Sequence, residues 1–283
     1  MPTPIRLAAV DVDGTLLDPD GEIRPRVEQS IKAAMTAGCE VILATGRRLR
    51  SAAPIARRLG ISTLILVDGA AICDLNVGET VYERTLPSQL QRYALDLMEA
   101  AGLPPILLES PGLGDRVFAG PPALDNPQAA GYLSRRDEVH LVPPETLARL
   151  PRIVSILGMG ARERIEHLAS LAEVAASFTS TFWVPSNVGY HTYVLGLNAP
   201  GVSKGEALRW LAERRGIRRE QTLAVGDYEN DVSLLASAGF AVAMGNAVKS
   251  VKSVAHAVVA DNANDGVAEA FERWILSDEV SGQ

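Results

Sequence analysis

Two pairs of carboxylates, far apart in the chain, have the residue types and the spacing that phosphate or metal chemistry requires. Asp11 and Asp13 follow a short apolar stretch, and in an extended segment side chains two residues apart leave the same face. Asp227 and Asp231 follow another apolar stretch near the other end of the chain. If the two stretches are neighbouring strands, four carboxylates share one site and repel one another unless a cation lies among them. A carboxylate is also ionised at neutral pH, so it can act as a nucleophile without a base.

Magnesium is the cation that these oxygen ligands fit best. Mg²⁺ prefers oxygen ligands and usually takes one or two protein carboxylates together with phosphate oxygens of a substrate. The histidines that softer metals would need are scattered along the chain, at His140, His167, His191 and His256. The sequence therefore predicts a Mg²⁺ site rather than a zinc or copper site.

Two further features could hold an anion beside these carboxylates. Thr45 and Gly46 follow an apolar stretch and precede a predicted helix, where a hydroxyl and free backbone N–H groups stabilise negative charge. Lys204 lies at the predicted start of another helix, where its charge opposes the helix dipole unless an anion binds there. Each feature alone is weak evidence, because threonine is an ordinary N-cap and a lysine at an exposed helix end is tolerated.

Strands and helices alternate in the two terminal parts of the chain. Such alternation predicts βαβ crossovers and a buried parallel sheet, whose strands end at a common ligand-binding edge. The expected strands are residues 5–10, 40–44, 63–67, 222–225, 240–244 and 256–260, and the expected helices are 24–37, 47–59 with an interruption near Pro54, 204–215 and 229–238.

The middle of the chain follows a different pattern. It is rich in proline pairs and mixes expected helices at 88–101 and 161–175 with strand-like pieces at 153–157, 178–184 and 190–197. This favours an α+β insert between two halves of one sheet domain. The expected division is a first core part at 1–84, an insert at 85–189 and a second core part at 190–283.

The composition excludes several classes of function. The net charge is −7 without a long basic run, which argues against binding nucleic acid or an anionic membrane surface. No apolar run approaches the roughly 20 residues of a membrane span, and the N-terminus lacks the apolar stretch of a secretory signal. The two cysteines, Cys39 and Cys73, have no metal-type spacing, so a reducing cytoplasm is the expected location. Oligomeric state is not indicated.

Taken together, these motifs resemble those of the haloacid dehalogenase-like (HAD) phosphatases. The resemblance rests on four pieces: Asp11-Val12-Asp13-Gly14-Thr15, Thr45-Gly46-Arg47, Lys204, and Gly226-Asp227 through Asn230-Asp231. The insert is similar in position and size to the C2B cap of the Cof-type subfamily IIB. The implied fold is α/β, a Rossmann-like parallel sheet HAD core with an inserted α+β C2B cap domain.

The resemblance also implies roles for these residues. Asp11 would attack phosphorus and form an aspartyl-phosphate, while Asp13 would serve as general acid and then as general base. The implied substrate is a small-molecule phosphate ester, a phosphorylated metabolite such as a sugar phosphate. The phosphoryl oxygens would be held by Thr45, Gly46, Lys204 and Asn230, and Mg²⁺ by Asp11, the backbone carbonyl of Asp13, Asp227 and the supporting Asp231.

Other interpretations remain open. A phosphosugar mutase of the same fold would use the same core residues, and a non-catalytic binding module would keep the metal site without turnover. The segment from Gly201 to Gly205 matches the G-x-S-x-G elbow of α/β-hydrolases, with Ser203 as nucleophile and His256 downstream.

Two features of this chain concern the substrate. Cof-type proteins usually have Asn-Gly-Ala after the third strand, whereas this chain has Asp68-Gly69-Ala70, which replaces an amide donor with a negative charge. Cap residues that could contact the leaving group are Arg135, Arg136, Tyr190 and His191.

Overall fold

The chain folds into two compact units. A computed structural model describes residues 4–136, 138–175, 177–183 and 192–277. One unit, the core, is built from both ends of the chain, up to Val81 and from Ser203 onward, and the other, the insert, is Tyr82–Val202. The second junction therefore lies later than the expected boundary at 189/190.

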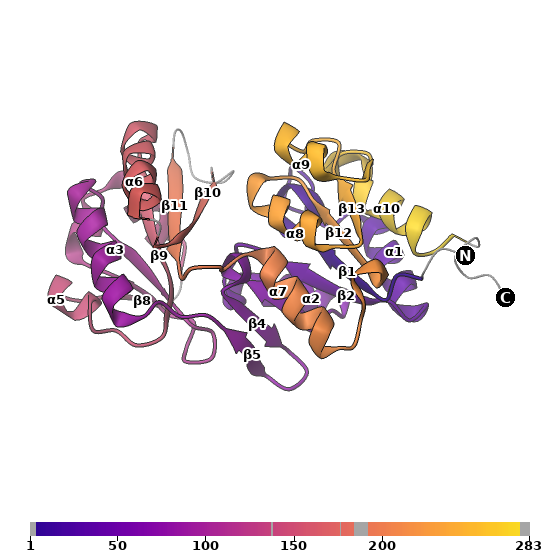
Figure 1. Ribbon diagram of the computed structural model, residues 1–283, viewed down its shortest axis with the longest axis horizontal. Helices are drawn as coiled ribbons and strands as arrows, with labels where there is room; N and C mark the ends of the chain where they lie inside the picture. Colours follow the sequence, from indigo (N-terminus) through magenta and orange to yellow (C-terminus); the bar gives the residue numbers. More distant parts are fainter. Residues whose placement is uncertain (1–3, 137, 176, 184–191, 278–283) are drawn as a thin grey trace. The chain divides into compact units, whose positions relative to one another are not determined.

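The core unit contains an eight-stranded sheet in the order β14-β13-β12-β1-β2-β3-β4-β5. Strand β1 lies between β2 and β12 and is parallel to both, so strands from the N-terminal and C-terminal parts of the chain are neighbours in the middle of the sheet (Figure 1). All four residues of β1 are buried, as expected for a parallel strand covered on both faces. The strands are β1 (Leu7–Val10), β2 (Glu40–Ala44), β3 (Thr63–Leu66), β4 (Ala71–Asp74), β5 (Glu79–Glu83), β12 (Thr222–Gly226), β13 (Phe240–Ala243) and β14 (Ala257–Val258).

The helices of the core agree with the expected pattern, with two differences. Pro54 does not interrupt its helix, because its position is exposed and water can bind the carbonyl that it leaves without a donor. The helix expected at 229–238 is divided into a 3₁₀ turn at Glu229–Asp231 and a short α-helix. The helices are α1 (Pro25–Thr36), α2 (Leu49–Leu59), α7 (Lys204–Arg214), α8 (Val232–Ser237), α9 (Lys249–Val254) and α10 (Gly266–Trp274).

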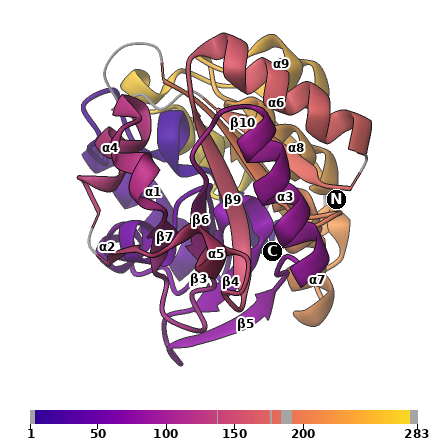
Figure 2. The same ribbon diagram turned by 90° about the vertical axis from the view of Figure 1, so that its left-hand side faces the viewer.

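The insert has its own six-stranded sheet in the order β10-β11-β9-β6-β7-β8. Neighbouring strands are antiparallel except β7 and β8, and α3 and α6 pack beside each other against β9 (Figure 2). Strand β11 pairs with β9 and β10, which is why the second junction follows it. The elements are α3 (Ser88–Ala100), β6 (Ile106–Glu109), β7 (Val117–Ala119), α4 (Pro127–Leu133), β8 (Val139–Leu141), α5 (Pro144–Leu147), β9 (Ile153–Gly160), α6 (Arg162–Ala175), β10 (Thr179–Trp183) and β11 (Tyr193–Asn198).

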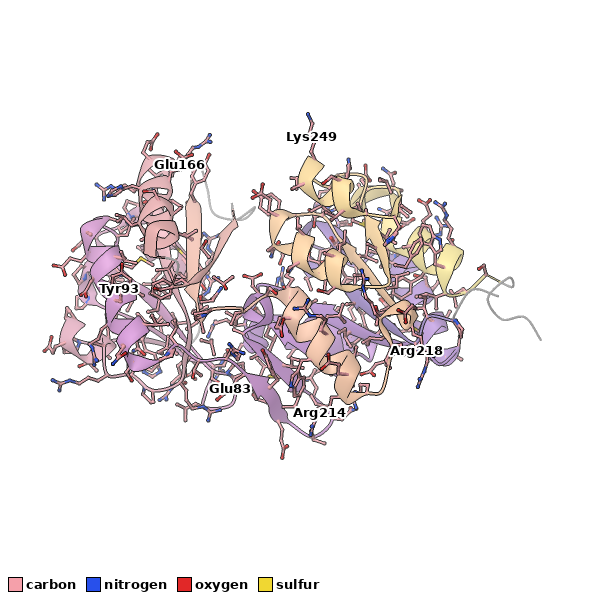
Figure 3. The ribbon with its side chains drawn as sticks, in the orientation of Figure 1. Glu83, Tyr93, Glu166, Arg214, Arg218 and Lys249 are labelled. Atoms are coloured by element: carbon pink, nitrogen blue, oxygen red, sulfur yellow. The ribbon has the colours of Figure 1, made fainter. Side chains whose placement is uncertain are left out.

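Charged side chains lie on the outside of both units. Glu166 on α6 and Lys249 on α9, for example, point into solvent (Figure 3), while the strands and the inner faces of the helices carry the buried apolar residues. No helix among the described residues is long and apolar enough to cross a membrane. A parallel-sheet core with an α+β insert confirms the expected fold class.

Candidate active site

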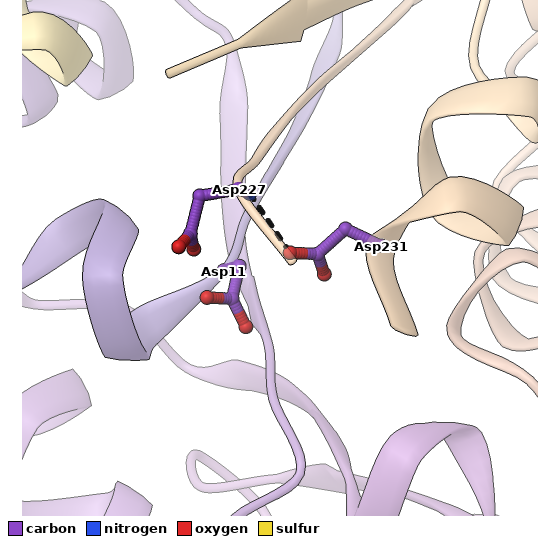
Figure 4. Close-up of side chains that lie close together, drawn as sticks. All are labelled: Asp11, Asp227 and Asp231. Carbon is purple, nitrogen blue, oxygen red and sulfur yellow. Dashed lines mark hydrogen bonds between the residues drawn. The ribbon is translucent and has the colours of Figure 1, made fainter. Parts of the chain in front are cut away.

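Neighbouring strands of the core bring the two carboxylate motifs together. Asp11 follows β1 directly, and its backbone N–H donates to the carbonyl of Val225 on β12 at 3.0 Å. Asp227 follows β12, so both side chains start at the same edge of the sheet. Asp231 lies at the end of the 3₁₀ turn that follows and reaches back toward them (Figure 4).

Three carboxylates form a compact buried group. Asp11, Asp227 and Asp231 each offer an oxygen, and these atoms all lie within 4.8 Å of one another. Burial, followed by the charge of Asp231, raises the pKa of Asp11 well above its usual range. The same two causes raise the pKa of Asp227 to about 6. The site therefore disfavours its own negative charge when no cation is bound.

A buried lysine partly compensates this charge. Lys204 Nζ donates to Asp11 Oδ1 at 2.6 Å and to Asp231 Oδ1 at 2.7 Å, and its side chain is fully buried. Burial alone would lower the pKa of Lys204, but the two carboxylates outweigh it and raise the pKa. Lys204 is the first residue of α7, whose N-cap Ser203 accepts a hydrogen bond from the Glu206 N–H at 3.1 Å.

Local backbone geometry fixes the other two acids. Asp231 Oδ2 accepts the backbone N–H groups of Asp227 at 3.0 Å and Tyr228 at 3.2 Å, which holds the turn after β12 closed. Gly14 has φ +82°, and a Cβ there would lie 2.4 Å from Asp227 Oδ2. Thr15 Oγ1 donates to Asp227 Oδ1 at 2.8 Å. The turn after β1 therefore needs glycine both for its backbone and for the close approach of Asp227.

Asp13 lies outside the carboxylate group. Its carboxylate accepts two hydrogen bonds from Arg47, Nε to Oδ2 at 2.8 Å and Nη2 to Oδ1 at 2.6 Å, and its side chain is 51% exposed. Arg47 belongs to the Thr45-Gly46-Arg47 motif but was not among the expected site residues. A two-point contact between guanidinium and carboxylate holds the Asp13 side chain in one orientation.

The expected phosphate-binding residues surround Asp68. Asn230 Nδ2 donates to Asp68 Oδ1 at 2.8 Å. A Cβ at Gly46 would lie 3.1 and 3.2 Å from the two Asp68 oxygens, so this backbone faces the carboxylate directly. Thr45 is fully buried, and its hydroxyl accepts the Arg47 N–H at 3.1 Å. Gly46, Asn230 and Thr45 are thus gathered at one place in the core.

Asn246 is a further residue beside the site, and the sequence alone assigned no role to it. Its Nδ2 donates to the Gly14 carbonyl at 2.8 Å and lies 3.3 Å from Asp227 Oδ2, while its Oδ1 accepts the Asn262 N–H at 3.2 Å. It joins the turn after β1 to the turn after β12. The run from Ala243 to Ala247 was the signal in the sequence, since it follows the neighbouring strand β13.

The hydrolase elbow is not present. Ser203 follows a turn instead of a strand, and its hydroxyl caps α7. His256 Nδ1 accepts the backbone N–H of Ala241 at 2.9 Å and stacks on Phe240, with ring centroids 5.2 Å apart. This serine and histidine therefore both have structural partners.

The expected cap contacts are only partly described. Arg135 Nε donates to the Gly131 carbonyl at 2.9 Å, and Arg136 Nη1 donates to the Tyr132 carbonyl at 2.6 Å, so both arginines contact their own helix α4. Tyr190 and His191 lie outside the described residues.

The donor set fits a hard divalent cation. The three buried carboxylates offer oxygens within 4.8 Å of one another, and the pKa values of Asp11 and Asp227 are raised. A bound Mg²⁺ would relieve the repulsion between these groups. No histidine or cysteine lies in this group. Asp11, Asp227 and Asp231 are therefore the residues that could hold the ion.

Comparison with known proteins agrees with this site. A family model described as haloacid dehalogenase-like hydrolase matches residues 8–271. The chain is 27% identical to 5-amino-6-(5-phospho-D-ribitylamino)uracil phosphatase YcsE of Bacillus subtilis (strain 168), over 96% of each chain. It is also 27% identical to pyridoxal phosphate phosphatase YbhA of Escherichia coli (strain K12), over 93% of this chain and 96% of that protein. A solved haloacid dehalogenase-like hydrolase from Bacteroides thetaiotaomicron has a TM-score of 0.79 at 25% identity and covers 95% of this chain and 99% of its own. Because the family match spans nearly the whole chain, the protein belongs to the haloacid dehalogenase-like hydrolases.

Proposed function

We propose that this protein is a Mg²⁺-dependent phosphatase that hydrolyses small phosphorylated metabolites through an aspartyl-phosphate. The observation that carries the proposal is the buried group of Asp11, Asp227 and Asp231 with Lys204 between two of its members. A nucleophile, a cation site and a fixed positive charge thereby lie together at the sheet edge where α/β proteins bind ligands. The two relatives named above are both phosphatases by name.

In the first step Asp11 supplies the nucleophile. A carboxylate oxygen attacks phosphorus, the bond to the ester oxygen breaks, and that oxygen leaves with the electron pair. Asp13, which must take a proton from solvent once it is released from Arg47, donates that proton to the leaving oxygen, so the product leaves as an alcohol. Because Asp13 contacts Arg47 through both oxygens, this contact must open before Asp13 reaches the leaving group.

In the second step water attacks the aspartyl-phosphate, and the Asp13 carboxylate accepts a proton from that water. The bond between phosphorus and the Asp11 oxygen breaks, which restores both carboxyl groups to their starting forms. A bound Mg²⁺ would supply positive charge to the phosphoryl oxygens during both steps. Lys204 supplies fixed charge from the protein itself, and its contact with Asp11 orients the nucleophile.

The phosphoryl group would be held by Thr45, Gly46, Lys204 and Asn230. The backbone at Gly46 and the amide of Asn230 both face Asp68, and Lys204 contacts Asp11. A ring of fixed donors around a transferring phosphoryl group stabilises the charge that spreads over its oxygens in the transition state.

Sugar phosphates are the substrate class that we propose first. The named relatives are, by name, phosphatases of a phosphorylated ribitylaminouracil and of pyridoxal phosphate, which are chemically different phosphate esters. Release of inorganic phosphate from a panel of phosphorylated metabolites would rank the candidate substrates. Isomerisation of a sugar phosphate without release would instead indicate a mutase.

Asp11→Asn tests the nucleophile directly. We expect turnover of a generic phosphate ester with Mg²⁺ to fall at least about a thousandfold, because the amide is not nucleophilic. Asp20→Asn is the matched control, since Asp20 is exposed and its loss of charge leaves the site intact. Wild-type turnover in the Asp11 variant, or full activity in excess chelator, would refute the proposal.

A further inference from the structure

The Asp68 carboxylate lies among the groups that would hold the phosphoryl oxygens. It is 6% exposed, and one of its oxygens accepts the Asn230 amide at 2.8 Å. Among the described residues its second oxygen, Oδ2, accepts no hydrogen bond, and it stays partly open to solvent. Both oxygens lie close to the Cα of Gly46, where a Cβ would be 3.1 and 3.2 Å from them. An anion held by both Gly46 and Asn230 would therefore lie next to the Asp68 carboxylate.

The backbone places Asp68 firmly at this point. Asp68 has φ +54°, a left-handed conformation, and its N–H donates to the Thr45 carbonyl at 3.1 Å. The next residue, Gly69, lies so close to the start of α7 that a Cβ there would be 2.1 Å from the Ser203 carbonyl oxygen. The backbone at Asp68 and Gly69 is thus held between Thr45 and the start of the helix that carries Lys204.

A carboxylate next to an oxyanion needs a proton between the two groups before they can form a hydrogen bond. Both groups are acceptors, so they form no hydrogen bond with each other and repel when both are fully ionised. Burial raises the pKa of Asp68; the charge of Lys204 opposes this rise and the charge of Asp231 adds to it. Lys204 already donates to two other carboxylates.

We propose that Asp68 shares one proton with the bound phosphoryl group, which makes the site selective for a tetrahedral oxyanion that carries a proton. The ligand class is a hydrogen phosphate or the monoanion of a phosphate ester. Fully deprotonated oxyanions of the same size are rejected. This inference rests on the proposed function only in taking Gly46 and Asn230 as phosphate ligands.

Phosphate and sulfate provide a charge-matched test. At about pH 8 inorganic phosphate is a dianion that still holds one proton, whereas sulfate is a dianion with none. A site built around a proton on its ligand rejects an analogue that lacks it, because the acceptor that the bound analogue covers then has no partner. Calorimetric titration of the full-length chain with each anion, in excess Mg²⁺, measures the preference without turnover.

We expect the wild-type protein to bind phosphate at least about tenfold more tightly than sulfate at this pH. Asp68→Asn should lose the preference mainly by gaining affinity for sulfate, since its amide donates where the carboxylate could only accept. Asp68→Gly, which keeps the left-handed backbone, should also lose the preference for phosphate, with a smaller gain in affinity for sulfate. Asp20→Asn should behave as the wild type.

The inference is overturned if the wild type binds both anions equally or neither, or if the Asp68 variants keep the wild-type preference. These outcomes are separate from those of the proposed function. Turnover of esters with an unchanged preference in the Asp68 variants overturns this inference alone. A lost preference in a protein that turns over no ester overturns the phosphatase assignment alone.

Discussion

In the metal-free protein, Asp227 should make stability fall as the pH rises. Burial and the charge of Asp231 raise the pKa of Asp227 from its ordinary value of 3.8 to about 6. Below the unfolded value both states hold the proton, and between the two values only the folded state does. The stabilisation is therefore full below about pH 4 and is lost as the pH rises through about 6. A shift of this size corresponds to about 3 kcal/mol in the free energy of unfolding.

Urea unfolding at a series of pH values, in excess chelator, measures this contribution. Other carboxylates also titrate, and Glu28, whose pKa is lowered by Lys32, changes stability in the opposite direction. The informative quantity is therefore the difference between the wild type and Asp227→Asn, which should change by about 3 kcal/mol between about pH 4 and 7.5. Asp20→Asn should show no such difference.

Mg²⁺ should restore the stability that the protein loses at neutral pH. An ion that binds only the folded state at a hundred times its Kd stabilises it by about 2.7 kcal/mol. We expect this gain in the wild type and most of it to disappear in Asp227→Asn. Parallel pH profiles of the two proteins, together with an unfolding midpoint indifferent to Mg²⁺, would refute the reasoning that the carboxylates form a cation site.

Three other substitutions probe single contacts. Lys204→Met removes the cation between two buried carboxylates and should lower the free energy of unfolding by about 3 to 5 kcal/mol in chelator, less at low pH, as urea titrations would show. Gly14→Ala forces a Cβ against Asp227 and should abolish the thermal shift produced by Mg²⁺; an unchanged shift contradicts the close approach. Arg47→Ala frees the Asp13 carboxylate and should change kcat more than the unfolding temperature; steady-state kinetics and thermal melts decide this, and a large loss of stability with normal kcat would make the contact structural.

The parts of the site that follow from parallel-sheet geometry were predictable. Asp11 and Asp227 each come directly after an apolar strand, and neighbouring parallel strands end at one edge, so their meeting needed no knowledge of the loops. Asp13 was different. Its spacing from Asp11 suggested a shared face, but its direction is set by Arg47, more than thirty residues away in the chain. No local pattern encodes that contact.

The insert shows why short strands escape sequence patterns. β7 and β8 have three residues each, too few for an alternation of apolar and polar side chains to be recognised. β9 extends to Gly160, beyond the expected end, because its glycines make room for packing. A Cβ at Gly158 would lie 2.8 Å from Leu168 and 2.9 Å from Met98. A glycine that usually weakens a strand is here required by the helices against it.

Charge balance connects the metal site with the inferred proton. Four buried carboxylates, Asp11, Asp68, Asp227 and Asp231, surround one ammonium group, that of Lys204. Buried charge is costly unless it is compensated, so the excess has to be neutralised when the site is loaded. Of the three remaining charges a bound divalent cation would compensate two, which leaves one negative charge on the protein's own groups before the phosphoryl group adds its own. A proton shared between Asp68 and the phosphoryl group reduces the repulsion between these two. With an amide at position 68 the extra negative charge is absent, and the inference predicts that the site accepts fully deprotonated oxyanions. On this inference the aspartate at position 68 therefore sets which form of the phosphoryl group binds, while the proposed nucleophile, Asp11, and the candidate cation site stay the same.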